Sequence, residues 1–290
     1  MTDSIRSRID PLIADRAPWL FADRVGTGML RTGLHRMLRY DDTLRLGEAL
    51  SALPSAALMD RLGRLLAREL TVSGLDHVPR HGPALVVANH PTGIADGIVL
   101  NHVLSRVRQD AYFFANHDIL RVMPQMTDMI APVEWREDRR SHAKTRETML
   151  YTRRAVAAGR LGVIFPSGRL AKRRGLRLHE RPWMASAAMI ARKFDLPVVP
   201  VNIRARNSAL FYIFDLIHPT LRDITLFHET LNKARQPFEI TVGEPISAAA
   251  LPDRSEDGIA MLRRATLALG GATHAATVSL IDSSLRPGRA

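Results

Sequence analysis

A run of apolar residues, Ala84–Ala88, is followed at once by Asn89, His90 and Pro91, and this junction constrains the fold more than any other segment. Five consecutive apolar residues bounded by turn-forming residues are typical of a strand buried on both faces of a parallel sheet. Apolar runs of similar length recur at residues 111–115, 129–133, 161–165, 196–203 and 238–242, with helix-like segments between them. This alternation predicts an α/β fold, a sheet flanked by helices.

The first 70 residues are predicted to be helical and amphipathic. Residues 26–39 and 58–70 each carry their leucine and methionine side chains on one stripe. Such a stripe normally faces the core, but a basic amphipathic helix can also lie on an anionic bilayer. We expect the 58–70 helix to face the core and leave both interpretations open for the 26–39 helix. The chain then divides into an N-terminal helical segment (1–70), a main α/β domain (71–270) and a flexible tail (271–290).

The chain is strongly basic, with 41 Lys and Arg against 29 Asp and Glu and a formal net charge of +12. The excess concentrates at residues 136–181, where 14 Lys and Arg face 4 Asp and Glu. A basic surface of this kind attracts polyanions, such as nucleic acid, anionic lipid or a phosphorylated cofactor. It can equally be a solvated face with no partner.

Cysteine is absent, which excludes disulfides, thiolate nucleophiles and zinc–thiolate sites. No stretch approaches the ~18 apolar residues of a membrane span. The start of the chain lacks an apolar core of signal-peptide length. We therefore expect a protein that is soluble or attached at a membrane surface, with the cytoplasm as its default location.

His90 and Asp96 are the strongest candidates for chemistry. Ligands of α/β sheets bind at the carboxyl ends of the strands, where His90 is predicted to lie. A histidine held there by a carboxylate can remove a proton from an alcohol near neutral pH. Gly93 and Gly97 permit the tight backbone path that such a pair needs. The alternative is a structural histidine, with Asp96 as an acid in the first turn of a helix.

Two further segments are candidate binding elements. Phe165–Arg169 reads as a strand end, a tight turn and an arginine, which together could hold a phosphate or a developing oxyanion. The basic run 171–177 could grip a phosphopantetheine, an acidic carrier protein or lipid headgroups. Aromatic residues are not interleaved across residues 170–180, which weakens an RNA-binding interpretation. The Asn-His pair at residues 116–117 is interpreted as a bystander, and no histidine spacing supports a metal site.

Between residues 72 and 247 the chain resembles the 1-acylglycerol-3-phosphate acyltransferase superfamily. Four blocks match in order, and they begin at Asn89, Ala131, Phe165 and Leu196. Two departures, five residues between His90 and Asp96 and Ser167 in place of a glutamate, resemble a bacterial branch labelled hemolysin-like. That branch includes O-acyltransferases of lyso-aminolipids such as lyso-ornithine lipid. Further segments that resemble it are 181–183, 206–208, 211–212 and 231–234.

The resemblance implies that His90 deprotonates an acceptor hydroxyl and that Asp96 orients the ring. The alkoxide then attacks an acyl thioester directly, and backbone N–H groups near Gly168, with Arg169, steady the oxyanion. Together with the basic run, the resemblance gives these substrate-binding candidates: Asn89, Gly93, Gly97, Arg136, Phe165, Pro166, Ser167, Gly168, Arg169, Lys172, Arg173 and Arg174.

The expected function is O-acyl transfer in phospholipid or ornithine-lipid metabolism, on the inner face of the cell membrane. Neither a cofactor nor a metal is expected; acyl carrier protein or coenzyme A would bring the acyl group as a co-substrate thioester. The membrane surface and a lyso-lipid acceptor are the other expected partners, and nucleic acid is not. The alternatives are a lysophosphatidic acid acyltransferase and a non-catalytic basic protein that binds membranes or nucleic acid.

Overall fold

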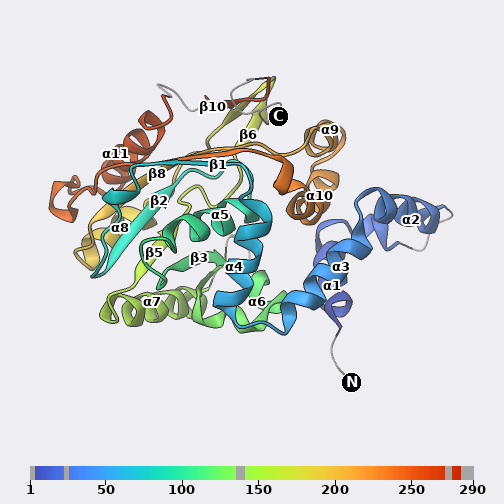
Figure 1. Cartoon of the computed structure of the whole chain (residues 1–290), viewed down its shortest axis with the longest axis horizontal. Coiled ribbons are helices and arrows are strands. Elements are labelled where there is room, and N and C mark those ends of the chain that lie inside the picture. Colours follow the sequence, from blue (N-terminus) through green and yellow to red (C-terminus); the bar gives the residue numbers. More distant parts are fainter. Residues whose placement is uncertain (1–3, 23–25, 135–140, 272–275, 282–290) are drawn as a thin grey trace.

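A twisted sheet of seven strands forms the centre of the molecule, in the order β1-β9-β8-β2-β5-β3-β4 (Figure 1). The structure is a computed structural model and describes residues 4–22, 26–134, 141–271 and 276–281. The strands of this sheet are β1 (Leu70–Ser73), β2 (Ala84–Ala88), β3 (Tyr112–Asn116), β4 (Ile130–Val133), β5 (Leu161–Ile164), β8 (Val198–Arg204) and β9 (Phe238–Val242).

The central strands run parallel, as their continuous apolar runs predict. β2 pairs in parallel with both β5 and β8, and β3 pairs in parallel with β4 and β5. β9 runs antiparallel to β8, and β1 follows β9. Every residue of β2 is buried. The carboxyl ends of the parallel strands therefore meet at one edge of the sheet, where ligands of such sheets bind.

Helices cover both faces of the sheet, because alternate residues of β2 pack into two separate cores. Val86 belongs to a core shared with α4 and α5, and Val87 to a core shared with α8 and α11. The helices of the structure are α1 (Ile5–Arg16), α2 (Thr27–Met37), α3 (Tyr40–Ser51), α4 (Ser55–Leu66), α5 (Ile94–Leu104), α6 (Asp118–Val122), α7 (His142–Ala157), α8 (Ser186–Lys193), α9 (Ala209–Ile217), α10 (Pro219–Asn232) and α11 (Ser255–Ala268).

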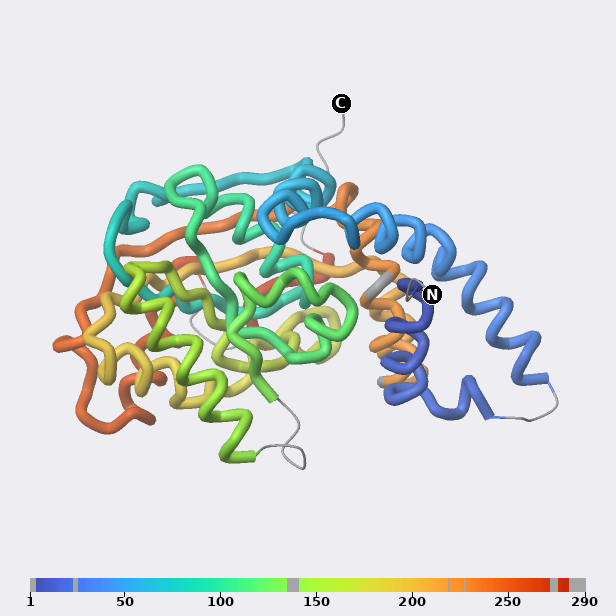
Figure 2. Tube along the Cα trace, turned by 90° about the horizontal axis from the view of Figure 1, so that it is seen from below, coloured from blue at the N-terminus to red at the C-terminus, as the bar shows by residue number. Residues whose placement is uncertain are grey.

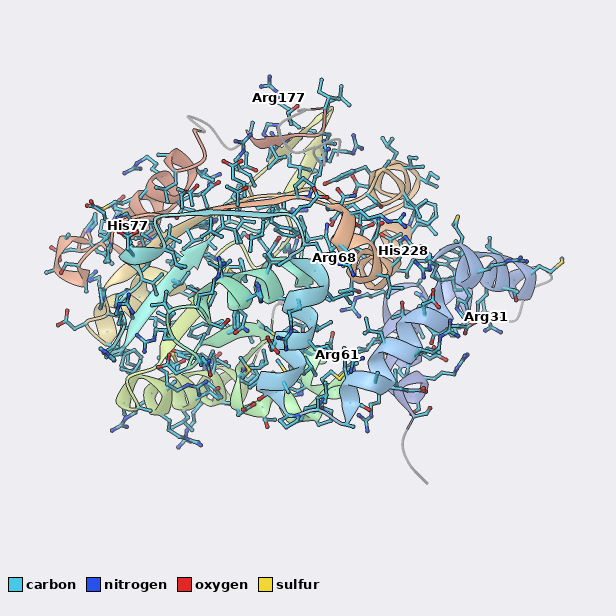
Figure 3. The ribbon with its side chains drawn as sticks, viewed as in Figure 1. Arg31, Arg61, Arg68, His77, Arg177 and His228 are labelled. Carbon is cyan, nitrogen blue, oxygen red and sulfur yellow. The ribbon has the colours of Figure 1, made fainter. Side chains whose placement is uncertain are left out.

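The N-terminal helices α1–α3 form an arm that packs against α9 and α10 around a third core (Figure 2). Leu34 and Leu38 enter this core from the α2 segment. His228 of α10 adds a polar link, with its Nδ1 3.0 Å from the carbonyl of Leu38 (Figure 3). Part of the apolar stripe of α2 therefore faces the core, whereas Leu30 and Met37 of the same helix are exposed. α4 faces the core under the sheet, as predicted, and the division of the chain at residue 70 stays a prediction.

A second, smaller sheet was not predicted. It has three antiparallel strands, β6 (Lys172–Arg174), β7 (Arg177–His179) and β10 (Ala276–Ser279), in the order β10-β7-β6. The basic run 171–177 lies in the β6–β7 hairpin. Residues 276–279, which were expected to belong to a flexible tail, form a strand in which Val278 is buried. Three-residue strands that pair with a segment 100 residues away leave no local periodicity for a sequence pattern to detect.

Within the described residues, no helix is both long and apolar enough to cross a bilayer.

Candidate active site

His90 stands immediately beyond the carboxyl end of β2, as predicted. Asn89 fixes this position: its side-chain amide donates to the carbonyl of Ile203 at 2.9 Å and accepts from the Ile203 N–H at 2.7 Å. Asn89 thus clamps the end of β2 to β8. Asn89 is fully buried, and both the nitrogen and the oxygen of its side-chain amide are hydrogen-bonded to the backbone. Its role is therefore to hold the strand end rather than to bind substrate.

Asp96 lies in the first turn of α5 and is fully buried. Its Oδ2 atom accepts from the Nδ1 of His90 at 2.9 Å, and also from the backbone N–H groups of Thr92 (2.8 Å) and Gly93 (2.9 Å). Its Oδ1 atom accepts from the Thr92 hydroxyl at 2.5 Å. The two interpretations of Asp96 therefore hold together: it completes the start of α5, and with the same carboxylate it orients an imidazole.

This hydrogen bond decides which ring nitrogen can act as a base. An ionised carboxylate only accepts, so Nδ1 carries the proton and Nε2 keeps its lone pair. The ring of His90 stacks on Phe165, with centroids 4.4 Å apart, and the side chain is 18% exposed. Two contacts thus fix the ring, and its remaining edge lines an open cavity. A general base needs such an arrangement, a ring held in one tautomer with its other nitrogen available.

The cavity has a volume of about 1520 Å³ and its wall is mostly apolar. It reaches from His90 past α4, α5 and β3 to the N-terminal helix α1, and α10 also contributes to it. The volume exceeds that of ordinary small-molecule sites and suits a long flexible chain. Predicted site residues on its wall are His90, Gly93, Gly97, Phe165, Pro166, Gly168 and Arg169.

Other predicted binding residues lie elsewhere. Lys172, Arg173 and Arg174 belong to the β6–β7 hairpin and are not part of the cavity wall. Ser167 is buried behind the wall, with its hydroxyl bonded to the carbonyl of Arg169 at 2.8 Å. Arg136 lies outside the described residues. The hairpin is therefore a surface feature next to the site and not its lining.

The backbone N–H of Gly168 bonds the carbonyl of Phe165 at 2.9 Å and closes the turn, so it is already occupied. That backbone N–H groups near Gly168 steady an oxyanion stays a prediction. The cations on the same part of the wall are Arg169 and Arg181. Arg181 is held by its Nε, which donates to the carbonyl of Leu170 at 2.8 Å.

Sequence reasoning missed a buried carboxylate beside the dyad. Glu180 accepts the backbone N–H of His90 at 3.2 Å and the indole N–H of Trp183 at 2.8 Å. Burial raises the pKa of the Glu180 carboxyl, while the hydrogen bond from Trp183 acts in the opposite direction. Glu180 thus ties the backbone of His90 to the side chain of Trp183.

A second group that the sequence did not reveal is a buried ion pair behind Asp96. Lys233 is fully buried; its Nζ lies 3.6 Å from Glu229 and donates to Arg206 O and Asn207 Oδ1. Asn207 in turn donates to the carbonyl of Thr92 at 3.3 Å, so a polar chain connects Lys233 to the dyad. Burial lowers the pKa of Lys233 to about 8, while Glu229 and Asp96 act in the opposite direction.

Among the described residues, no group of three or more His, Asp or Glu side chains is placed to hold a metal ion.

The Gly93 turn can be tested by itself. Gly93 has φ +102°, and an added Cβ would lie 2.8 Å from Leu170 Cδ2. We expect Gly93→Ala to lower the free energy of unfolding in urea by about 1–3 kcal/mol, because the new side chain meets Leu170 and the backbone conformation is one that side chains avoid. Gly82→Ala is the matched control, with φ +78° and no atom within 4 Å of the new Cβ, and it should lose less. A Gly93→Ala protein as stable as wild type would show that the turn tolerates a side chain.

The comparisons with known proteins agree with this geometry. A family model described as Acyltransferase matches residues 69–204, the segment from β1 to β8 that contains the dyad. This segment of the chain is thus similar to acyltransferase domains. The family resemblance seen in the motifs is thereby confirmed, and so is the α/β fold with N-terminal helices.

Two curated relatives of the acyltransferase domain are named lyso-glycine lipid O-acyltransferase. The protein from Phocaeicola vulgatus is 23% identical over 187 residues, which cover 62% of this chain and 65% of the relative. The protein from Bacteroides thetaiotaomicron is 24% identical over 191 residues, covering 62% of this chain and 67% of the relative. The chain thus spans just under two thirds of the length of the first relative.

A solved structure is also similar, the crystal structure of the 1-acyl-sn-glycerophosphate acyltransferase PlsC from Thermotoga maritima. The match has a TM-score of 0.47 at 14% identity and covers 74% of this chain and 78% of that chain.

Proposed function

We propose that this protein is an O-acyltransferase that moves a fatty acyl group from an acyl thioester to the hydroxyl of a membrane lyso-lipid. The observation that carries the proposal is the 2.9 Å contact between His90 Nδ1 and Asp96 Oδ2 at the wall of a large apolar cavity. A general base beside a space for a long apolar chain suits the acylation of an alcohol by a fatty thioester.

The acceptor we propose is a lyso-aminolipid, such as lyso-glycine lipid or lyso-ornithine lipid. Two curated relatives carry the name lyso-glycine lipid O-acyltransferase. Ser167 stands where the resembling phosphate-lipid enzymes have a glutamate, and its hydroxyl is turned to the Arg169 carbonyl and not into the cavity. A phosphate-free acceptor accounts for both observations.

The proposed reaction is a direct transfer without an acyl-enzyme. Nε2 of His90 takes the proton from the acceptor hydroxyl while the oxygen attacks the thioester carbonyl carbon. A tetrahedral oxyanion forms, and Asp96 stabilises the imidazolium from the side of Nδ1. The C–S bond then breaks, the ester is complete, and the leaving thiolate takes the proton from His90. Arg169, on the cavity wall, is the proposed counter-charge for the oxyanion.

The acyl donor is the fatty acyl thioester of acyl carrier protein or of coenzyme A, and no further cofactor is proposed. Both donors are acidic, and the chain carries a formal net charge of +12. Because the acceptor resides in a bilayer, we propose that the protein works as a peripheral protein on the inner face of the cell membrane. Nucleic acid has no part in this proposal.

The test is a transfer assay with the purified full chain. Each acyl donor is offered with lyso-glycine lipid, lyso-ornithine lipid or lysophosphatidic acid, and the diacyl product is measured. We expect product with at least one aminolipid. Product only with lysophosphatidic acid would support the phosphate-lipid alternative. No product with any acceptor, together with a gel shift of nucleic acid, would support a non-catalytic basic protein.

Repeating the assay at two salt concentrations separates the donors. Inhibition by salt only with acyl carrier protein would indicate a protein–protein contact through surface charges, which salt screens. Equal rates at both salt concentrations would argue against a charge-driven contact with either donor.

A further inference from the structure

The outward side of α9 is apolar, which is unusual for a helix at a protein surface. Phe211 and Phe214 face inward and are buried. Ile213, Leu216 and Ile217 lie on the opposite side and are 51%, 68% and 64% exposed. A surface helix normally presents polar residues to water, and a helix that is apolar all round is normally covered.

The charge on α9 is neutralised, which makes the helix still less polar. Asp215 is the one residue of α9 with a charged side chain. Its two carboxylate oxygens bind Arg173 of the β6–β7 hairpin at 3.2 Å and Arg222 of α10 at 3.1 Å. With nine residues, α9 is about 14 Å long and far too short to span the ~30 Å core of a bilayer. It can lie in an interface, parallel to the surface.

The tip of the β6–β7 hairpin belongs to the same surface. The Arg173–Asp215 pair joins it to α9, and Tyr212 packs against the small core under the hairpin. Leu176 at the tip is 59% exposed, and the exposed Arg174 and Arg177 flank it. Figure 3 places Arg177 at the outer edge of the molecule. Apolar side chains ringed by arginine are the combination that anionic headgroups attract.

This surface also borders the cavity. Arg222, which holds Asp215, lines the cavity wall together with Leu226 of α10. A lipid surface in contact with α9 would therefore lie next to the space that leads to His90. α2 exposes Met29 and Leu30 as well, but it lies at the far end of the N-terminal arm (Figure 1).

We propose that these residues form a docking face for an anionic bilayer, defined here as Leu176, Ile213, Leu216 and Ile217 with Arg174 and Arg177. The inference rests on the proposed function, since a lipid acceptor requires contact with a membrane, and it names the surface that makes this contact. Leu176, Leu216 and Ile217 enter the headgroup region, and the arginines bind anionic lipid.

The test measures binding to vesicles without turnover, by co-sedimentation of the full chain with vesicles of phosphatidylcholine and phosphatidylglycerol. Leu216→Ser combined with Ile217→Ser should weaken binding at least about tenfold, because interfacial affinity grows with the apolar area buried. Leu150→Ser, at a 42% exposed leucine of α7, is the matched control and should bind as wild type.

A second pair of variants tests the charges. Arg174→Glu with Arg177→Glu should weaken binding to anionic vesicles, with a smaller effect in high salt. Arg153→Glu with Arg154→Glu makes the same change of net charge at exposed positions of α7 and should have the smaller effect. If both pairs of charge reversals weakened vesicle binding equally, binding would depend only on the net charge of the protein, and the assignment of the surface would be overturned.

Other outcomes would also overturn the proposal. If Leu216→Ser changed the oligomeric state and left vesicle binding unchanged, the face would be an interface between copies. If the hairpin charge reversal weakened binding of acyl carrier protein and not of vesicles, the face would belong to the donor. Turnover with acceptor in detergent micelles separates this inference from the proposed function: the variant with Leu216→Ser and Ile217→Ser should keep that activity, and a wild-type protein inactive there would contradict the function itself.

Discussion

Replacing His90 by alanine is expected to lower the rate of acyl transfer by about 10²- to 10⁴-fold, the usual effect of losing a general base. The fold should remain, because Asp96 keeps its three hydrogen bonds from Thr92 and Gly93 and α5 keeps its start. The measurement is the rate of diacyl product formation under saturating donor, together with the thermal unfolding midpoint of the same preparation.

The matched control is His117→Ala. His117 lies in the second Asn-His pair of the chain, but it is exposed at the start of α6. Its removal should leave the rate within about twofold of wild type, since surface substitutions away from a site have small effects. A His90→Ala protein with near-normal turnover would remove the base from the mechanism. Loss of activity in both variants would point to an effect that is not specific to the dyad.

The local parts of the site were predictable because the sequence encodes them locally. A buried strand ends at Ala88, and the chain must turn there, so His90 falls at the sheet edge whatever the rest of the fold does. Asp96 is six residues further on and enters a helix, within reach of the ring. The apolar runs also predicted the central strands of the sheet.

The supporting residues could not be predicted because long-range packing decides their environment. Glu180 is an acidic residue in a basic stretch, and periodicity alone suggests a solvated side chain. Its carboxylate is instead buried against Trp183 and the backbone of His90, a residue 90 positions earlier in the chain. Lys233 is paired with Glu229 on α10 and reaches Asn207 in the loop after β8.

One signal for these residues was present in the chain. The segments 181–183, 206–208 and 231–234, which resemble the hemolysin-like branch, contain Trp183, Asn207 and Lys233. In the structure Trp183 binds Glu180, and Asn207 connects Lys233 to Thr92. Motifs that carry no evident chemistry in the sequence therefore hold the loops on which the dyad stands.

Asp96→Asn separates the charge of the carboxylate from its hydrogen bonds. In the structure Oδ2 accepts three N–H groups, whereas Oδ1 meets only the Thr92 hydroxyl. An asparagine can place its oxygen at the Oδ2 position and its NH₂ group at Thr92 Oγ1, because a hydroxyl also accepts. His90 Nδ1 then keeps its acceptor, so the ring keeps its tautomer and α5 its first turn, and only the negative charge is lost.

The expected loss is about 2–4 kcal/mol of stabilisation of the imidazolium in the transition state, or roughly 30- to 10³-fold in rate. The acyl-transfer rate of the purified variant gives the loss, and its unfolding midpoint gives the state of the fold. Asp96→Ala is the contrasting variant, since it leaves the buried N–H groups of Thr92 and Gly93 without their acceptor and should lower the midpoint as well. Normal turnover by Asp96→Asn would mean that the imidazolium needs no counter-charge, and Asp96 would then be only the acid that starts α5.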